Sequence, residues 1–238
     1  MAIVSISLGG LVIHAFLTHF VDKQWKDTYI DSWLTLSGLF NGFAQSFHNV
    51  VFGRNQFLGF PVFKETHVRD AYRTWGSANW LIPKPIYGDN RVILETPTRQ
   101  YRISDIPEVL QGDQRSMYQE YFRFNSTADP GVPVDCWYSE SNKQTAVAYK
   151  TNVPMDREAF YTSNPIPVKT IHGIGDDSAD PASLSVCKNW KSTRHVRVVK
   201  YCHVCVLKTA KAVSEAANHL LHGPSPNNST ATDEVVVA

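Results

Sequence analysis

The N-terminal residues hold a pattern of apolar and small side chains that strongly limits the possible backbone arrangement. Ala2–Ile6 is typical of a short buried strand, and the pair Gly9–Gly10 breaks it. Apolar residues then recur at helical spacing over residues 11–21, and Tyr29–Leu36 alternates as a strand does. Strand, tight glycine turn, helix and strand follow one another in parallel α/β sheets. We therefore predict an α/β fold.

Later segments fit the same prediction. Val92–Leu94, Val168–Ile171 and Val196–Val199 are short segments rich in β-branched residues that we expect to be strands. Ala210–Leu221 has the spacing of a closing helix, and Asn227–Ala238 has no helix or hairpin signal and is expected to be a tail.

Residues 42–60 differ from the rest of the chain. Gly, Asn, Gln and Ser are mixed there with five phenylalanines, without a clean helix or strand period. The pattern predicts a long irregular loop, and loops of this length are usually functional or poorly ordered.

The charge balance limits the partners. The chain of 238 residues has a formal net charge of +1, so nothing draws it as a whole toward nucleic acid or an acidic surface. Aromatic residues make up 12% of the chain. Such a content suits an apolar ligand and an ordinary core equally well.

Ser7 lies where the predicted strand turns into the predicted helix. A serine nucleophile on such a sharp turn needs small residues two positions before and after it, since larger side chains would collide. Ser5 and Gly9 meet that need. The helix that follows would direct its N-terminal dipole at developing negative charge. The alternative is an ordinary small-residue turn.

Two further segments complete a possible catalytic set. Asp176 follows the strand expected at 168–171, and an acid there can orient a catalytic imidazole. His203 follows the strand expected at 196–199. The chain order Ser7, Asp176, His203 is the one that α/β-hydrolases use. A solvated acidic turn is the alternative for Asp176.

A metal centre is the competing interpretation near His203. Cys202, His203 and Cys205 could bind zinc together with Cys187 or His195. Two thiols separated by only two residues, with one distant partner, do not match the usual spacing of zinc ligands.

The chain contains an ordered set of short motifs: SLGG (7–10), QWKDTYI (24–30), LSG (36–38), SANWLIP (77–83), ETPT (95–98), GDDSADPASLSVCKNW (175–190) and HVCVL (203–207). Together these motifs resemble the lecithin:cholesterol acyltransferase and lysosomal phospholipase A2 family. They occur in the family's order and span most of the chain. The resemblance implies the C-terminal part of an α/β-hydrolase fold, beginning near the nucleophile and without the family's N-terminal strands.

Carried over position by position, the resemblance implies Ser7 as nucleophile, Asp176 as orienting acid and His203 as general base. The N–H of Leu8 would donate to the oxyanion hole. The segment 43–60 would be the family's lid, and its phenylalanines would shield an acyl chain and contact lipid. These lid residues are Phe43, Phe47, Phe52 and Phe57.

The chain departs from the family pattern at several positions. Ile6 replaces a histidine before the serine, and the segment 39–41 lacks the family's Ala-Pro-Trp-Gly character. Ile171 stands where many relatives have a cysteine that bridges to the position of Cys187, so the family's disulfide at Cys187 lacks its usual partner here. The stretch before His203 is short, which leaves His195 as the alternative base.

On this resemblance the chain divides into four parts. Residues 1–42 are the elbow part of the core, 43–160 a lid and cap-like insertion, 161–222 the C-terminal core with the acid and histidine loops, and 223–238 a tail.

The family's second oxyanion donor lies in the part that precedes the elbow, and the loss of one donor lowers the rate by about 10²- to 10³-fold. We therefore expect the chain on its own to be impaired. We also expect it to be poorly folded, because the strand at residues 2–6 would lack the family's partner strands on one side.

The resemblance implies serine-dependent acyl transfer from a phospholipid or other acyl lipid to water or a lipid alcohol, at a membrane or lipoprotein surface. It implies no metal and no organic cofactor. The alternative is a non-catalytic remnant that binds lipid or a partner. Family membership implies a secreted or lysosomal protein, although residues 2–17 lack the flanks of a signal peptide.

Overall fold

The computed structural model describes residues 1–53, 56–57, 60–61, 64–110, 112–124, 126–155, 166–203 and 205–223. The chain forms two compact units, which are described separately. The first comprises Met1–Phe40, Ser126–Thr145 and the chain from Ile174 onward, and we call it the sheet unit. The second unit comprises Asn41–Asn125 and Ala146–Gly173. The four predicted parts rest on family resemblance and stay a prediction.

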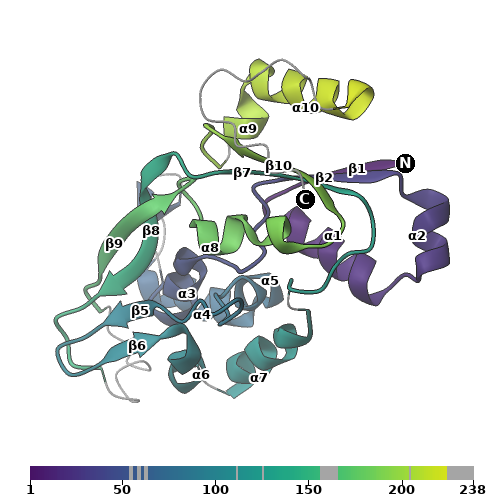
Figure 1. The fold of residues 1–238 in the computed structure, drawn as a ribbon. Helices are drawn as coiled ribbons and strands as arrows, with labels where there is room; N and C mark the ends of the chain where they lie inside the picture. The colour runs from purple at the N-terminus through teal and green to yellow at the C-terminus, as the bar shows by residue number, and fades with distance from the viewer. Residues whose placement is uncertain are drawn as a thin grey trace. The chain divides into compact units, whose positions relative to one another are not determined.

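A four-stranded parallel sheet organises the sheet unit, in the order β1-β2-β7-β10 (Figure 1). Every residue of β2 and β7 is buried, as expected for inner strands with both faces covered. The strands are β1 (Ala2–Ile6), β2 (Ser32–Leu36), β7 (Val134–Ser139) and β10 (Thr193–Val199). The predicted α/β fold with a parallel sheet is therefore confirmed.

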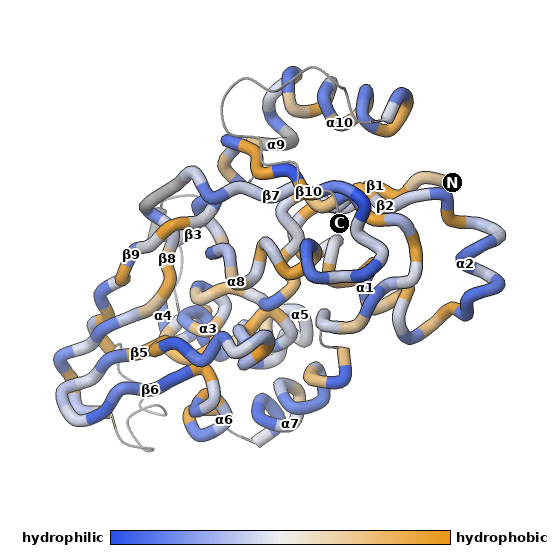
Figure 2. The backbone as a smooth tube through the Cα atoms, in the orientation of Figure 1, coloured by the Kyte–Doolittle hydropathy of each residue, from blue (hydrophilic) through white to orange (hydrophobic). Residues whose placement is uncertain are grey.

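Helices cover both faces of this sheet (Figure 1). On one side, α10 packs Ala212 and Ala216 against Leu34, Trp137 and Val199 of the strands. Hydrophobic and hydrophilic residues alternate along this helix, so one face can bury while the other meets water (Figure 2). α1 and α8 lie on the other side. The helices of the unit are α1 (Leu8–His19), α2 (Lys23–Tyr29), α8 (Pro181–Leu184), α9 (Cys205–Lys208) and α10 (Ala210–His222).

β1 is an outer strand of this sheet. Within the described part of the chain it pairs with β2 alone, and β2, β7 and β10 all lie on that one side. β7 was not predicted, and neither was α2, which begins where Asp22 accepts a hydrogen bond from the Trp25 N–H at 2.8 Å. The predicted strand at 29–36 is therefore too long, since Tyr29 ends this helix.

The second unit combines helices with a mixed sheet of order β6-β5-β8-β9. β5 runs antiparallel to β6 and parallel to β8. β8 and β9 continue into the sheet unit, because the unit boundaries fall within them. The elements are α3 (Ala44–Val51), β3 (Gln56–Phe57), β4 (Phe60–Pro61), α4 (Glu65–Thr74), α5 (Gly76–Trp80), β5 (Val92–Glu95), β6 (Gln100–Arg102), α6 (Ile106–Val109), α7 (Gly112–Glu120), β8 (Asn142–Lys150) and β9 (Lys169–Gly175). The strand expected at 168–171 thus exists, but it belongs to this sheet.

The prediction of an irregular loop over residues 42–60 is wrong, because α3 occupies Ala44–Val51. Phe47, Val50 and Val51 follow helical spacing and are buried in the core of the second unit. Ser46 is buried beside them because its hydroxyl donates to the Ala78 carbonyl at 2.7 Å. Because the polar Ser46 occupies a position on the buried face, the apolar residues of this segment do not show a clear helical period in the sequence.

Both disulfides lie in the sheet unit. Cys187 pairs with Cys136 of β7, and Cys202 pairs with Cys205. Cys187 therefore pairs with Cys136, a partner that the sequence analysis did not identify. All four cysteines are bonded, so none offers a thiolate to a metal. The zinc interpretation around Cys202 and Cys205 is therefore contradicted.

None of the helices in the described ranges has the length and apolar character needed to cross a membrane.

His14 of α1 is a buried histidine with one polar contact. Its ring stacks on Trp190 at 4.9 Å between centroids, and its Nε2–H donates to the Ala128 carbonyl at 2.8 Å. Its Nδ1 has no hydrogen-bond partner in the described structure. Burial lowers the pKa of His14 to about 4, with the hydrogen bond to Ala128 opposing the shift. His14 is therefore neutral in the folded protein at pH 7.

We expect His14 to make stability fall in mild acid. Between about pH 6.5 and pH 4 the unfolded chain binds a proton at this ring and the folded chain does not, so stability rises with pH. The shift corresponds to about 3 kcal/mol lost between pH 7 and pH 4. Urea unfolding at both pH values should show a shallower pH dependence in His14→Gln than in the parent. Equal slopes for the two proteins would contradict this account.

Candidate active site

Ser7 joins β1 to α1 in a strained conformation. Its φ of 57° and ψ of −132° lie where residues with a side chain are rarely found. Backbone hydrogen bonds hold the turn: the Ser7 N–H donates to Leu36 O at 3.2 Å, and Ser7 O accepts from Gly10 and Leu39. These bonds fix the serine at the turn between β1 and α1. Its side chain therefore stands in a position set by the backbone.

The residues around Ser7 are small because the turn brings them close together, as the sequence analysis predicted. A Cβ added to Gly9 would lie 3.8 Å from the Cβ of Ser5, so larger side chains at these two positions would meet. A Cβ added to Gly10 would lie 3.1 Å from the Cα of Gly38 and 3.2 Å from the Thr35 hydroxyl. α1 can approach β2 this closely only because Gly10 has no side chain.

Asp176 is held by the loop that follows β9. Its Oδ1 accepts hydrogen bonds from the N–H groups of Ser178 at 3.1 Å and Ala179 at 3.0 Å. The carboxylate is completely buried. A Cβ added to Gly175 would come within 2.1 Å of the Ala179 carbonyl, so the loop requires glycine there. These contacts leave Oδ2 of Asp176 in a fixed direction.

His203 connects the acid to the serine. Its Nδ1 lies 2.7 Å from Asp176 Oδ2, and its Nε2 lies 2.8 Å from Ser7 Oγ. Its backbone N–H donates to Asp176 O at 2.6 Å. A carboxylate only accepts, so Nδ1 carries the proton and Nε2 is free to accept from the Ser7 hydroxyl. The structure thus brings together the three residues that the sequence analysis selected.

The alternative base, His195, faces elsewhere. Its Nδ1 lies 2.7 Å from Asp135 Oδ1, on β7.

Leu8 is the first residue of α1, and the first N–H groups of a helix have no partner within the helix. Its N–H can therefore serve an oxyanion near Ser7.

The predicted lid residues belong to the second unit. Phe47 and Phe52 are buried in the core of that unit, and Phe43 is half-buried just before α3. The side chain of Phe57 lies outside the described residues. The lid role of these four residues stays a prediction.

Thr145 is a residue of this site that the sequence analysis missed. Its hydroxyl accepts a hydrogen bond from the Asp177 N–H at 3.0 Å. Asp177 has a φ of 84°, so this bond stabilises a sharp bend directly after the acid. Nothing in the sequence links residues 32 positions apart, so no local signal could have identified it.

Several known proteins are similar to this chain in sequence. Residues 1–121 match the family described as lecithin:cholesterol acyltransferase. Human lysosomal phospholipase A and acyltransferase is 26% identical over 209 residues, which cover 84% of this chain and 47% of that protein. Chicken phosphatidylcholine-sterol acyltransferase is 25% identical over 200 residues, covering 81% and 45%. The chain spans about half the length of these relatives.

A solved structure shares the fold. A chain from the crystal structure of the Tle4–Tli4 complex superposes with a TM-score of 0.61 at 12% identity, covering 89% of this chain and 57% of that chain. Together with the parallel sheet and the strand–serine–helix turn, the match assigns a partial α/β-hydrolase fold. The family match covers half of the sequence and includes the segment around Ser7. The chain therefore belongs to the lecithin:cholesterol acyltransferase family.

Proposed function

We propose that Ser7, His203 and Asp176 transfer an acyl group from a phospholipid or other acyl lipid, through an acyl-serine intermediate. The observation that carries the proposal is the position of the His203 ring. It lies at hydrogen-bond distance from Ser7 Oγ on one side and from Asp176 on the other. A serine activated by a base that a buried carboxylate orients is the arrangement of acyl-transfer enzymes.

The reaction follows from these contacts. Ser7 Oγ attacks the ester carbonyl while His203 Nε2 takes the hydroxyl proton. The oxyanion accepts a hydrogen bond from the Leu8 N–H at the positive end of α1. When the ester bond breaks, His203 returns the proton to the departing lipid oxygen, which leaves an acyl group on Ser7. Water or a lipid alcohol, deprotonated by the same imidazole, then takes the acyl group.

The proposed substrate class rests on the relatives. One is named a phospholipase A and acyltransferase, and another a phosphatidylcholine-sterol acyltransferase. The first name describes a phospholipase that is also an acyltransferase, and the second describes acyl transfer between phosphatidylcholine and a sterol. We extend that donor class to this chain because the family match includes Ser7. A membrane or lipoprotein surface is the proposed place of action.

The test is acyl transfer on vesicles. The purified chain is mixed with phosphatidylcholine vesicles that contain a long-chain alcohol, and lysophospholipid, fatty acid and alkyl ester are measured by mass spectrometry. We expect lysophospholipid together with one or both acyl products. Ser116→Ala, on the exposed face of α7, should leave these products unchanged and serves as the control. Vesicle binding without any acyl product would favour the alternative, a non-catalytic lipid-binding protein.

A further inference from the structure

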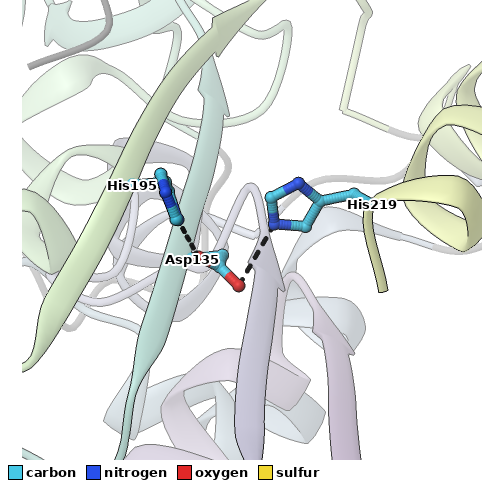
Figure 3. Close-up of side chains that lie close together, drawn as sticks. All are labelled: Asp135, His195 and His219. Carbon is cyan, nitrogen blue, oxygen red and sulfur yellow. Dashed lines mark hydrogen bonds and ion pairs between the residues drawn. The ribbon is translucent and has the colours of Figure 1, made fainter. Parts of the chain in front are cut away.

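A second group of histidine and aspartate side chains lies in the sheet unit, separate from the Ser7 machinery. Asp135 comes from β7, His195 from β10 and His219 from α10 (Figure 3). The Asp135 carboxylate is almost fully buried, and each of its oxygens faces one imidazole. His195 Nδ1 lies 2.7 Å from Oδ1, and His219 Nε2 lies 3.1 Å from Oδ2. Three possible metal-ligand atoms, from β7, β10 and α10, therefore lie close together.

We propose that Asp135, His195 and His219 form a binding site for a divalent transition-metal ion, with Zn²⁺ as the best-fitting member of that class. Two imidazole nitrogens and one carboxylate oxygen are a ligand set that zinc takes in proteins. With three protein ligands, the fourth position of a tetrahedron is left for water or an exogenous group. This inference is independent of the proposed function.

The distances suit such an ion after a small adjustment. Zinc lies about 2.0–2.2 Å from nitrogen and oxygen ligands, so the ligand atoms of a tetrahedral site are about 3.4 Å apart. The two measured separations are 2.7 and 3.1 Å, and all three donor atoms lie within 4.8 Å of one another. The side chains must therefore spread by well under the length of a bond to admit the ion.

The charges also suit a cation. The Asp135 carboxyl is surrounded by two imidazoles, at 2.7 and 3.1 Å, and by the Arg194 guanidinium at 3.1 Å, all of which pair with a carboxylate. Asp135 therefore offers a carboxylate. A neutral imidazole can bind the metal through the nitrogen that now faces Asp135 by moving its proton to the other ring nitrogen. The carboxylate then neutralises part of the charge of the ion.

Arg194 is the group that competes with the ion. Its Nη2 lies 3.1 Å from Asp135 Oδ2, so its positive charge occupies one side of the same carboxylate. About half of its side chain is exposed (47%), so the guanidinium can turn into water when a metal arrives. Removing this charge should therefore strengthen metal binding. A merely structural cluster would show no such gain, which makes the sign of this effect informative.

The expected consequence is a metal that fastens α10 to the sheet. Because His219 is on α10 and the other two ligands are on strands, the ion binds the folded chain only. Zn²⁺ at about 100 times its dissociation constant should raise the melting temperature by about 5–10 °C. The fold-change in affinity between variants then reports which residues bind it.

The experiment titrates Zn²⁺ into EDTA-treated, purified chain, with calorimetry for affinity and thermal unfolding for stability. We expect one ion per chain, and at least about a 10-fold weaker dissociation constant in His219→Gln. His222→Gln, an exposed histidine one turn on in α10, is the matched control and should bind as the parent does. Arg194→Gln should bind several-fold more tightly than the parent.

A second control separates this site from the triad, which also pairs an imidazole with a carboxylate. His203→Gln should retain the ion at parental affinity. Loss of binding in His203→Gln, with unchanged binding in His219→Gln, would place the ion at the triad and overturn the proposal. So would weaker binding in Arg194→Gln, or no calorimetric binding to a folded parent. If His219→Gln fails to fold, the Arg194→Gln and His203→Gln results still decide.

Discussion

Ser7→Ala is expected to lower kcat for hydrolysis of a soluble ester by about 10⁴- to 10⁶-fold, with little change in thermal unfolding. The substitution removes one oxygen, the atom that lies 2.8 Å from His203 Nε2. Nothing in the elbow backbone depends on that oxygen, since the turn is held by backbone hydrogen bonds to Leu36, Gly10 and Leu39. The measurement is the steady-state rate on a short-chain ester, together with the melting temperature. Turnover at the parental rate would remove Ser7 from the mechanism.

His203→Ala should reduce kcat to within about an order of magnitude of Ser7→Ala, because triad members act as a unit. His195→Ala is the matched comparison, since both histidines contact a buried aspartate by Nδ1 at 2.7 Å. Only His203 reaches Ser7, so His195→Ala should keep most of the activity of its folded fraction. A damaging His195→Ala with a harmless His203→Ala would reverse the assignment.

Phe47→Ala should lower the free energy of unfolding by about 3–5 kcal/mol, the range for a buried phenylalanine. Phe47 is fully buried (0% exposed) on α3, in the core of the second unit with Ile93 and Tyr118. Truncation leaves a cavity that rigid neighbours cannot fill. Chemical denaturation measures the loss. Phe20→Ala is the control, because Phe20 is 68% exposed and should cost less than about 0.5 kcal/mol.

Phe47→Ala also tests the prediction that Phe47 belongs to a lid. A lid residue should affect turnover of vesicles more than turnover of a soluble ester, with stability largely unchanged. Burial predicts the opposite for Phe47: a large fall in stability and an equal effect on both substrates in the protein that remains folded. A vesicle-selective loss at parental stability would show that Phe47 serves the lid.

Local patterns made part of the fold predictable. β1 has the predicted bounds, and α1, β10 and α10 lie close to theirs, because each has a clear apolar period of its own. β7 was missed because Asp135 interrupts its apolar run, and an aspartate is unfavourable in an inner strand. Its partners His195 and His219 are distant in sequence. The structure satisfies this residue with contacts that no local pattern reveals.

The candidate site was also predictable from the sequence only in part. The small residues around Ser7 are a local requirement, so the elbow could be recognised from the sequence. Asp176 and His203 were selected by chain order and family resemblance, and the choice between His203 and His195 needed the position of Asp135. The disulfide from Cys187 to Cys136 depends on α/β packing, and the same is true of the contact from Thr145 to the acid loop. Contacts of this kind between distant segments are set by the tertiary fold.

Stoichiometric labelling with a fluorophosphonate tests the central claim most directly, since the reagent reacts with a serine only when a base activates it. The purified chain is incubated with the probe, and the modified peptide is identified by mass spectrometry. In the part of the sample that folds, the arrangement of Ser7, His203 and Asp176 predicts one adduct per chain, on Ser7, that is absent in Ser7→Ala and strongly reduced in His203→Ala. A folded parent that stays unlabelled, or an adduct on another serine, would contradict the account.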